Sequence, residues 1–572
     1  MPPGVAAATL LAGALLSGCP AGGYQAPSGA APTSGPPPSP TPNPSTPGAP
    51  QPPPQPAQQP LPTQAESSRF LAQAGIAASM EDIGIVSTIG YAKWLDQQFA
   101  RPLSKPSAWS WIQTQAQGGP VSGGQIDAAV WRRLISGPDQ LRQRVVLALS
   151  EILVISAGQL DGVSDPTSMA GAFWDTLEQH AFGTFRQLLE AVTLSGAMGA
   201  FLNMRGSKKV NPRSGGQPDE NYAREVVQLF CIGLVELNPD GSSVLDRNGQ
   251  EIYTYTQEQV TAFAAALTGW DFDLAAGKKQ QDDPAFATRP MINNPSQFST
   301  GDKSVLGTVI PAALDGPAAL AMALDVLCNH PNNGPFIGRQ LIQRLVCSNP
   351  SPAYISRISA VFNNNGKGVR GDMRAVVTAV LLDPEARLPA AGPASGKLRE
   401  PIVRFAQWAR TFGMTSSDGT WQIGNLTGSL GQSPLRAPSV FNFFEPDYVP
   451  SNSTLGDNDV TAPEFQICTE STVVVYLNYM QSVIASGLKS STSVCAPDYS
   501  GELAYANDAA GLVARYNLLL AGGGLGADTL SMITSAVNNI SVSAATPEAG
   551  LKNRIWAAIF LIMAAPDYLI QR

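Results

Sequence analysis

Histidine is the scarcest chemically active side chain in this 572-residue sequence, which carries only His180 and His330. Two histidines exclude a three-histidine zinc site, and no His-Glu-x-x-His helix occurs. A Gly-x-Ser-x-Gly elbow, a Walker loop and a dinucleotide glycine fingerprint are also missing. His180 precedes Ala-Phe-Gly at a predicted helix junction, where we expect a capping or buried histidine rather than a catalytic one. The sequence therefore predicts no metal site and no cofactor, and a serine hydrolase of the usual architecture is disfavoured.

Charge of either sign is also sparse. Charged residues make up 14% of the chain, and the formal net charge is −8. An acidic balance of this kind argues against nucleic acid as a partner.

Cysteine is infrequent, and the five cysteines of the long body form no Cys-x-x-Cys pair. A zinc ribbon or a redox dithiol is therefore not indicated. In an oxidising compartment the first disulfides to consider are Cys328 with Cys347 and Cys468 with Cys495, because both would close short loops. Cys231 lies on the apolar side of its predicted helix, so we expect a buried free thiol there. Sequence alone leaves the connectivity open.

What the chain does have begins with an export signal. Residues 5–18 are almost wholly apolar or small, and the run is too short to stay in a membrane as a spanning helix. It ends in Leu-Ser-Gly-Cys, which looks like a bacterial lipobox with Cys19 as the lipidated residue. An ordinary secretory signal is the alternative, and residues 1–4 lack the usual basic start. With Pro20 after the cysteine rather than Asp, we expect a signal peptide over 1–18 and an outer-membrane or cell-surface lipoprotein.

A proline-rich tether follows. Residues 20–63 contain seventeen prolines and no charged residue. Such a composition cannot bury enough apolar surface to offset the entropy lost on ordering, so we expect a disordered tether over 19–66. In polyproline II form it would reach on the order of 100 Å. A plain spacer is favoured over an O-glycosylated stalk.

The remainder, 67–572, reads as one helical domain. We expect a mainly α fold with one small β-hairpin and long ordered loops at 270–312 and 413–460. The hairpin is expected at 244–255, where Asn248-Gly249 is a type I′ turn signal. Apolar periodicity predicts helices over about 88–100, 138–157, 168–180, 182–203, 218–236, 256–268, 315–329, 334–347, 352–364, 370–382, 396–412, 461–486, 504–520 and 546–570.

The most informative stretch is 218–241, PDENYAREVVQLFCIGLVELNPDG. Its acidic start suits the positive end of a helix dipole. Helical spacing pairs Glu220 with Arg224 and Asn221 with Glu225, so we expect Glu225 to be a buried partner whose removal destabilises the fold. Four apolar side chains are expected on its buried face: Val226, Val227, Phe230 and Leu234.

This stretch resembles the signature of the domain-of-unknown-function 1800 family, a group of exported bacterial proteins. The resemblance continues through LRQRVVLALSEILVIS (141–156), HAFGTFRQLLEAVTLSGAMGAFLNM (180–204), LTGWDFD (267–273), FIGRQLIQRLVCSNPS (336–351), GVRGDMRAVVTAVLLDPEAR (368–387), GKLREPIVRFAQWAR (396–410), LGQSPLRAPSVFNFF (430–444) and LIMAAPDYLIQR (561–572). It implies no established activity. Many members carry histidines where this chain has residues 147–150 and Phe230, so the resemblance places it in the branch without them. It also implies a possible partner, an exported protein of the domain-of-unknown-function 1501 family, whose members resemble alkaline phosphatases and sulfatases.

Carboxylates are the candidate catalytic groups: Glu151, Asp219, Glu220 and Glu225. A carboxylate on an apolar helix face is costly when unpaired, so Glu151 should meet a cation or a proton donor. A hydrogen-bonded Arg–Glu network joining helices is favoured over paired carboxylates for glycoside hydrolysis. Asp219, Asn221 and Glu225 supply too few oxygens for a calcium site.

Polar and aromatic side chains in the signature helix and in loop-like segments are the binding candidates: Asn221, Arg224, Trp270, Phe272, Asn442 and Phe444. The loop aromatics could form a carbohydrate or partner platform, although pinning loops to the body is favoured. The leading functional hypothesis is a surface-anchored accessory or binding lipoprotein that acts with an exported protein or an extracellular polymer. A carboxylate-based hydrolase of polysaccharide and a purely structural envelope protein are the alternatives.

Overall fold

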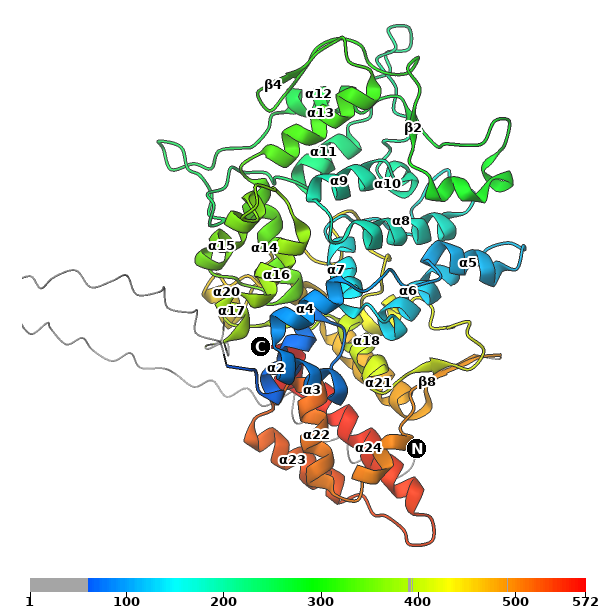
Figure 1. Ribbon diagram of the computed structural model, residues 1–572, viewed down its shortest axis with the longest axis vertical. Coiled ribbons are helices and arrows are strands. Elements are labelled where there is room, and N and C mark those ends of the chain that lie inside the picture. The colour runs from blue at the N-terminus through cyan, green and yellow to red at the C-terminus, as the bar shows by residue number, and fades with distance from the viewer. Residues whose placement is uncertain (1–59, 389–391, 393, 491) are drawn as a thin grey trace, which may run out of the picture.

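A computed structural model of the chain describes residues 60–388, 392, 394–490 and 492–572, and shows a mainly α fold (Figure 1). The expected signal peptide, Cys19 and residues 20–59 of the expected tether lie outside the described residues. In the described part, no helix has the length and apolar character needed to cross a bilayer.

The first half of the body is built from helices α2 (Gln64–Ala74), α3 (Met80–Ile89), α4 (Tyr91–Phe99), α5 (Ala108–Ala116), α6 (Gln125–Ser136), α7 (Gln140–Ser150), α8 (Pro166–His180), α9 (Phe185–Thr193), α10 (Gly196–Phe201), α11 (Asn221–Gln228) and α12 (Gln257–Ala266). The second half contains α13 (Gly316–Asn329), α14 (Asn333–Leu345), α15 (Pro352–Asn363), α16 (Met373–Leu382), α17 (Pro384–Arg387), α18 (Pro401–Thr411), α19 (Thr427–Leu430), α20 (Thr454–Asp457), α21 (Glu470–Ser486), α22 (Ala509–Ala521), α23 (Ala527–Asn538), α24 (Pro547–Ala564) and α25 (Pro566–Leu569). Short 3₁₀ turns lie at Gln280–Asp282, Pro284–Thr288, Pro463–Ile467 and Ser500–Tyr505.

The body is elongated, with α11 to α13 at one end and α22 to α24 at the other (Figure 1). Buried apolar side chains form one continuous cluster along it, from Phe70 to Tyr568. Helix α7 runs through the middle and is buried along its whole length. Because α7 is central, the polar side chain at its C-terminal end, Glu151, is also buried.

The first helix begins ahead of the expected domain boundary at residue 67. Thr63 caps α2, and the carboxylate of Glu66 accepts a hydrogen bond from the backbone N–H of Thr63 at 2.8 Å. This reciprocal capping box satisfies two free N–H groups and fixes the helix start at Gln64. Residues 64–66, expected in the tether, are therefore helical.

The end of the chain returns to the middle of the body. Strand β9 (Ile570–Gln571) pairs antiparallel with β5 (Lys397–Leu398). The side chain of Gln571 donates to the carbonyl of Leu345 at 2.9 Å and to that of Val346 at 3.1 Å. The last residues thereby close the carbonyl end of α14.

Strands are few and short, and all described pairs are antiparallel. The remaining ones are β1 (Trp270–Asp271) with β2 (Ile292–Asn293), β3 (Lys303–Val305) with β4 (Thr308–Ile310), and β6 (Thr415–Ser416) and β7 (Leu488–Lys489) on either side of β8 (Val494–Ala496). Between β3 and β4, Leu306 and Gly307 both have positive φ, the pattern of a type I′ turn. The expected long loops thus carry small sheets of their own.

The hairpin expected at 244–255 takes a different form. Residues 234–254, here called the 234–254 element, fold into three short segments rather than two strands. Glu236 donates its backbone N–H to Ile252, Ile252 to Val244, and Val244 to Glu236, so the segments close a ring. Of the two central turn residues only Gly249 has positive φ, so the expected type I′ turn is wrong.

Several expected helices are shorter in the structure, and two of them bear on the site. Helix α11 covers Asn221–Gln228 rather than 218–236, and Gly233 follows it with φ of 78°. Val226, Val227 and Phe230 are buried as expected, but Leu234 lies beyond the turn and is 47% exposed. Helix α7 ends at Ser150, so Glu151 is its C-cap residue and not an interior one.

The described cysteines are all free thiols, so neither expected disulfide is formed. Cys231 is buried as expected, and burial raises the pKa of its thiol well above the usual value. Of the two histidines, burial lowers the pKa of His180, and His330 accepts a hydrogen bond on Nδ1 from the N–H of Asn332 at 3.2 Å. No cluster of metal-ligating side chains occurs among the described residues.

Candidate functional site

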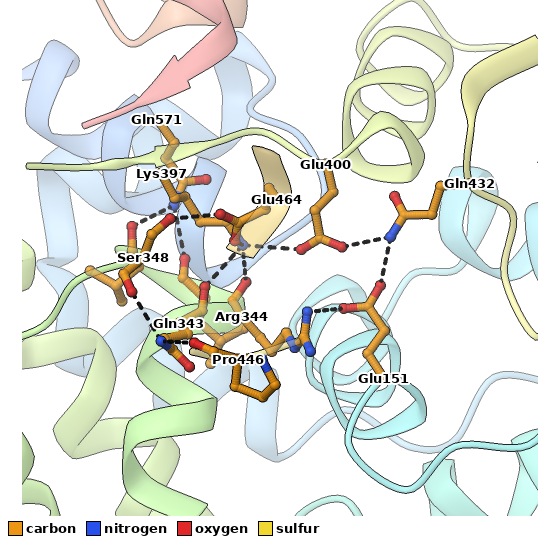
Figure 2. Close-up of polar contacts among 12 residues, drawn as sticks. Glu151, Gln343, Arg344, Ser348, Lys397, Glu400, Gln432, Pro446, Glu464 and Gln571 are labelled. Carbon is orange, nitrogen blue, oxygen red and sulfur yellow. Dashed lines mark hydrogen bonds and ion pairs between the residues drawn. The ribbon is translucent and has the colours of Figure 1, made fainter. Parts of the chain in front are cut away.

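A buried ion cluster centred on Lys397 joins α14, β5, α18 and the 3₁₀ turn at 463–467 (Figure 2). Lys397 Nζ lies 3.0 Å from a carboxyl oxygen of Glu400 and 3.2 Å from one of Glu464. It also donates to the carbonyls of Gln343 and Arg344, both at 3.0 Å. All three charged side chains are within 1% of complete burial, so two buried carboxylates share this one ammonium as their direct ion-pair partner.

Glu151 lies at the other side of this cluster (Figure 2). Its carboxyl is 3.6 Å from the guanidinium of Arg344. The side-chain amide of Gln432 donates to Glu151 at 3.2 Å and to Glu400 at 2.9 Å. The expectation that Glu151 meets a cation or a proton donor is confirmed, since it meets both.

Glu151 and Glu400 titrate in opposite directions. Burial, and next the charge of Glu400, raise the pKa of Glu151 well above its usual range. Burial alone would raise the pKa of Glu400 as well, but Lys397 and a hydrogen bond from Glu151 hold it well below its usual range. Burial therefore favours the protonated form of Glu151, whereas the nearby cations favour the ionised form of Glu400.

Glu151 also lines a groove of about 500 Å³. The walls of the groove come from five places: the end of α7, the end of α11 with the turn that follows it, α14, the 234–254 element and the loop 440–447. Phe336 and Phe444 supply apolar surface, and the guanidinium of Arg344 lies 4.4 Å from the centre of the Phe444 ring. The volume falls in the range of small-molecule sites, about 300–1,000 Å³.

Two buried amides open on this groove without partners. Gln340 is 5% exposed and Asn442 is 6% exposed, and both line the groove. Nε2 of Gln340 and Nδ2 of Asn442 make no hydrogen bond to any residue that the structure describes. Leaving such a donor unsatisfied is unfavourable by about 1–3 kcal/mol, so a folded protein rarely keeps two in one place.

Of the predicted site residues, the structure brings Glu151, Asn442 and Phe444 together on the groove. The start of the signature helix does not line it. Glu220 is closed by Arg224 at 3.2 Å, Gln257 at 2.7 Å and Thr261 at 2.7 Å.

The rest of that helix start also serves local structure. Asp219 accepts the backbone N–H of Asn221 at 2.9 Å, and the Asn221 side chain is exposed. No hydrogen bond joins the side chains of Asn221 and Glu225 in the described structure, so the expected pair is not formed. Oε2 of Glu225 is instead buried without a partner among the described residues, and burial raises the pKa of this carboxyl.

Removing the charge of Glu225 should therefore stabilise the protein. Its folded pKa is raised above the ordinary value of 4.5, so its unfavourable contribution is absent at lower pH and develops as pH rises through the folded pKa. Glu225→Gln is expected to match or exceed wild type in free energy of unfolding at neutral pH, with the difference vanishing below pH about 4. Denaturant titrations at both pH values measure this.

Glu220→Gln is the matched control on the same helix, because Glu220 has three hydrogen-bond donors to lose. A lower stability of Glu225→Gln than of Glu220→Gln at neutral pH would show that Glu225 has a partner after all.

The loop aromatics Trp270 and Phe272 pack against the body and so hold their loop in place. Trp270 is 4% exposed in β1, and Phe272 is buried between the guanidinium of Arg205, at 4.0 Å, and the ring of Phe286, at 4.9 Å. Neither lines the groove. An exposed aromatic platform is therefore not formed by these two residues.

Sequence reasoning missed most of the ion cluster and of the groove: Arg339, Gln340, Arg344, Lys397, Glu400, Gln432 and Glu464. One signal was available in GKLREP, where Lys397 and Glu400 stand three apart directly before Pro401. Proline at the first turn places Glu400 at the N-terminus of α18, and the short β5 places Lys397 against it. Glu464 carries no comparable signal, because its partners Lys397 and Ser348 are distant in sequence.

The structure is that of a large helical protein in which the ion cluster at Lys397 adjoins a groove with unsatisfied polar groups in its wall. The chain belongs to the family described as protein of unknown function (DUF1800), whose sequence profile matches residues 69–570. Searches of curated proteins and of solved structures returned no match.

Proposed function

We propose that this protein is an exported, membrane-tethered binding protein whose groove receives part of an extracellular polymer. The observation that carries the proposal is the pair of unsatisfied buried donors, Gln340 Nε2 and Asn442 Nδ2, on one groove. A ligand that supplies acceptor oxygens would satisfy both. The lipobox-like motif that ends at Cys19 and the proline-rich segment after it support a location outside the cytoplasm, where polymers are available as ligands. A protein partner of the domain-of-unknown-function 1501 family is proposed from the family resemblance alone.

Binding is favoured over catalysis because the paired carboxylates are closed off. Glu400 and Glu464 are held by Lys397, and neither lines the groove. Acid–base hydrolysis needs two carboxyl groups on either side of the substrate, about 5–10 Å apart. The pair Glu151 and Glu400 lacks that arrangement, since a single amide of Gln432 bridges the two.

A polysaccharide hydrolase is the second candidate, and one observation favours it. Glu151 lines the groove, and burial raises the pKa of its carboxyl, the direction that a general acid needs. If hydrolysis occurs, Glu151→Gln abolishes it and leaves polymer binding intact. A purely structural envelope protein would show neither activity nor binding.

The binding proposal is tested by removing the two donors. The double variant Gln340→Met, Asn442→Gly keeps the length of the first side chain, and glycine accepts the φ of 64° at residue 442. Affinity for envelope polysaccharide should fall about tenfold or more, while the free energy of unfolding stays near wild type because no internal hydrogen bond is lost. Native electrophoresis of the full-length protein through gels containing the extracted polysaccharide measures the first quantity, and denaturant titration the second.

Gln257→Met is the control, because Gln257 lies on α12 away from the groove and has hydrogen-bond partners. Equal retardation of the double variant and of wild type, or no retardation of wild type, contradicts the proposal.

A further inference from the structure

We propose that the inner end of the groove is an oxyanion subsite, formed by Arg339, Gln340, Arg344 and Asn442, that holds the acid group of an anionic sugar polymer. This inference rests on the proposed function and specifies its ligand. Carboxylate and phosphate groups share the required chemistry, since both offer several acceptor oxygens and negative charge.

Arg339 is the first reason. It lies on α14 directly before Gln340, and both line the groove. Its guanidinium makes no hydrogen bond to the described residues. Burial lowers its pKa, and Asp447, on the rim of the groove, opposes that shift. A half-buried guanidinium without a hydrogen-bond partner can form charge-assisted hydrogen bonds with an anionic ligand.

Arg344 adds a second positive charge. Its closest acidic group is Glu151 at 3.6 Å, and burial raises the pKa of that carboxyl, which weakens its hold on the guanidinium. Arg344 is also fixed in place, because its guanidinium lies over the Phe444 ring. An anion at the inner end would therefore meet a positioned cation rather than a flexible one.

The polarity of the groove changes from its inner end to its rim. The unsatisfied groups at the inner end, on Gln340 and Asn442, are donors. The rim instead carries exposed acids, Glu251, Glu445 and Asp447, which are acceptors. A sugar unit with one acid group matches this order: the acid group accepts at the inner end, and hydroxyl groups donate at the rim. Phe336 and Phe444 offer apolar walls to the faces of the ring.

Calorimetric titration of the full-length protein tests the subsite with three probes: trigalacturonate, its methyl ester and inorganic phosphate. We expect trigalacturonate to bind about tenfold or more tightly than the ester, because a charge-assisted hydrogen bond to guanidinium is lost on esterification. Arg339→Met should remove this discrimination while leaving the fold stable, since no hydrogen bond of Arg339 is broken. Arg374→Met is the control, because Arg374 pairs with Asp96 on the surface at 2.9 Å.

Each outcome decides the inference. Tighter binding of trigalacturonate than of its ester, lost in Arg339→Met, supports the subsite and identifies a carboxylate as the group that it binds. Binding of phosphate but not trigalacturonate, again lost in Arg339→Met, supports it with a phosphate group. Equal affinity for acid and ester overturns the subsite but leaves the groove as a binding site. If no probe binds, the subsite is overturned. The proposed function is then decided separately, by whether gels that contain envelope polysaccharide retard the wild-type protein.

Discussion

Lys397→Met is expected to lower the free energy of unfolding by about 3–5 kcal/mol, or to prevent folding, because it leaves Glu400 and Glu464 buried without their cation. Lys552→Met removes the same charge from an exposed pair, where Lys552 lies 2.7 Å from Glu548 with side chains 42% and 66% exposed. That change should alter stability by about 0–1 kcal/mol. Denaturant titration followed by circular dichroism compares the two variants.

Glu151→Gln completes the comparison. Burial raises the pKa of Glu151, and a glutamine has nearly the shape of the protonated carboxyl that burial favours, so its effect on stability should be small beside that of Lys397→Met. If Lys397→Met is as stable as Lys552→Met, the ion cluster does not hold the middle of the body together. A large loss in Glu151→Gln would mean that Glu151 is ionised.

Cys19→Ser is expected to release the protein from the membrane fraction or to leave an unprocessed precursor. The reason is chemical, because the proposed lipid anchor requires the thiol that serine lacks. Fractionation of cells into membrane and soluble parts, with immunoblotting of each, measures the effect.

Ser17→Ala is the appropriate control, because alanine keeps a small residue in the Leu-Ser-Gly-Cys motif. Normal processing and unchanged membrane partition of Cys19→Ser would contradict the lipoprotein assignment. Residues 20–59 would then need another role than that of a tether.

Local signals in the sequence predicted the helical fold well. Apolar periodicity identified α7, α8 and α13, and the apolar face of α11 is buried at Val226 and Val227. Where prediction failed, tertiary contacts decided. Helix α11 stops at Gln228, and Gly233 then turns the chain into the 234–254 element. Asn248-Gly249 is a strong local turn signal. Three segments hydrogen-bond to one another there rather than two, and the turn is not of type I′.

The site was predicted in part, and for a clear reason. Glu151 could be singled out because a carboxylate beside an apolar run must have a partner. Its partners Arg344 and Gln432 are far away in sequence and follow no local pattern. The missing partner of Glu225 could not be foreseen either, because helical spacing puts Asn221 within reach without fixing where its side chain points.

The central claim is that the groove is the binding site, and hydrogen–deuterium exchange on the full-length protein with and without envelope polysaccharide tests it most directly. Backbone amides in contact with a bound polymer exchange more slowly, because opening of their hydrogen bonds is suppressed. We predict slower exchange in 228–243, 336–344 and 440–447, the segments that line the groove, and no change in α22 to α24 at the far end of the body. Slower exchange confined to other segments, under conditions where the polymer is bound, would contradict the claim.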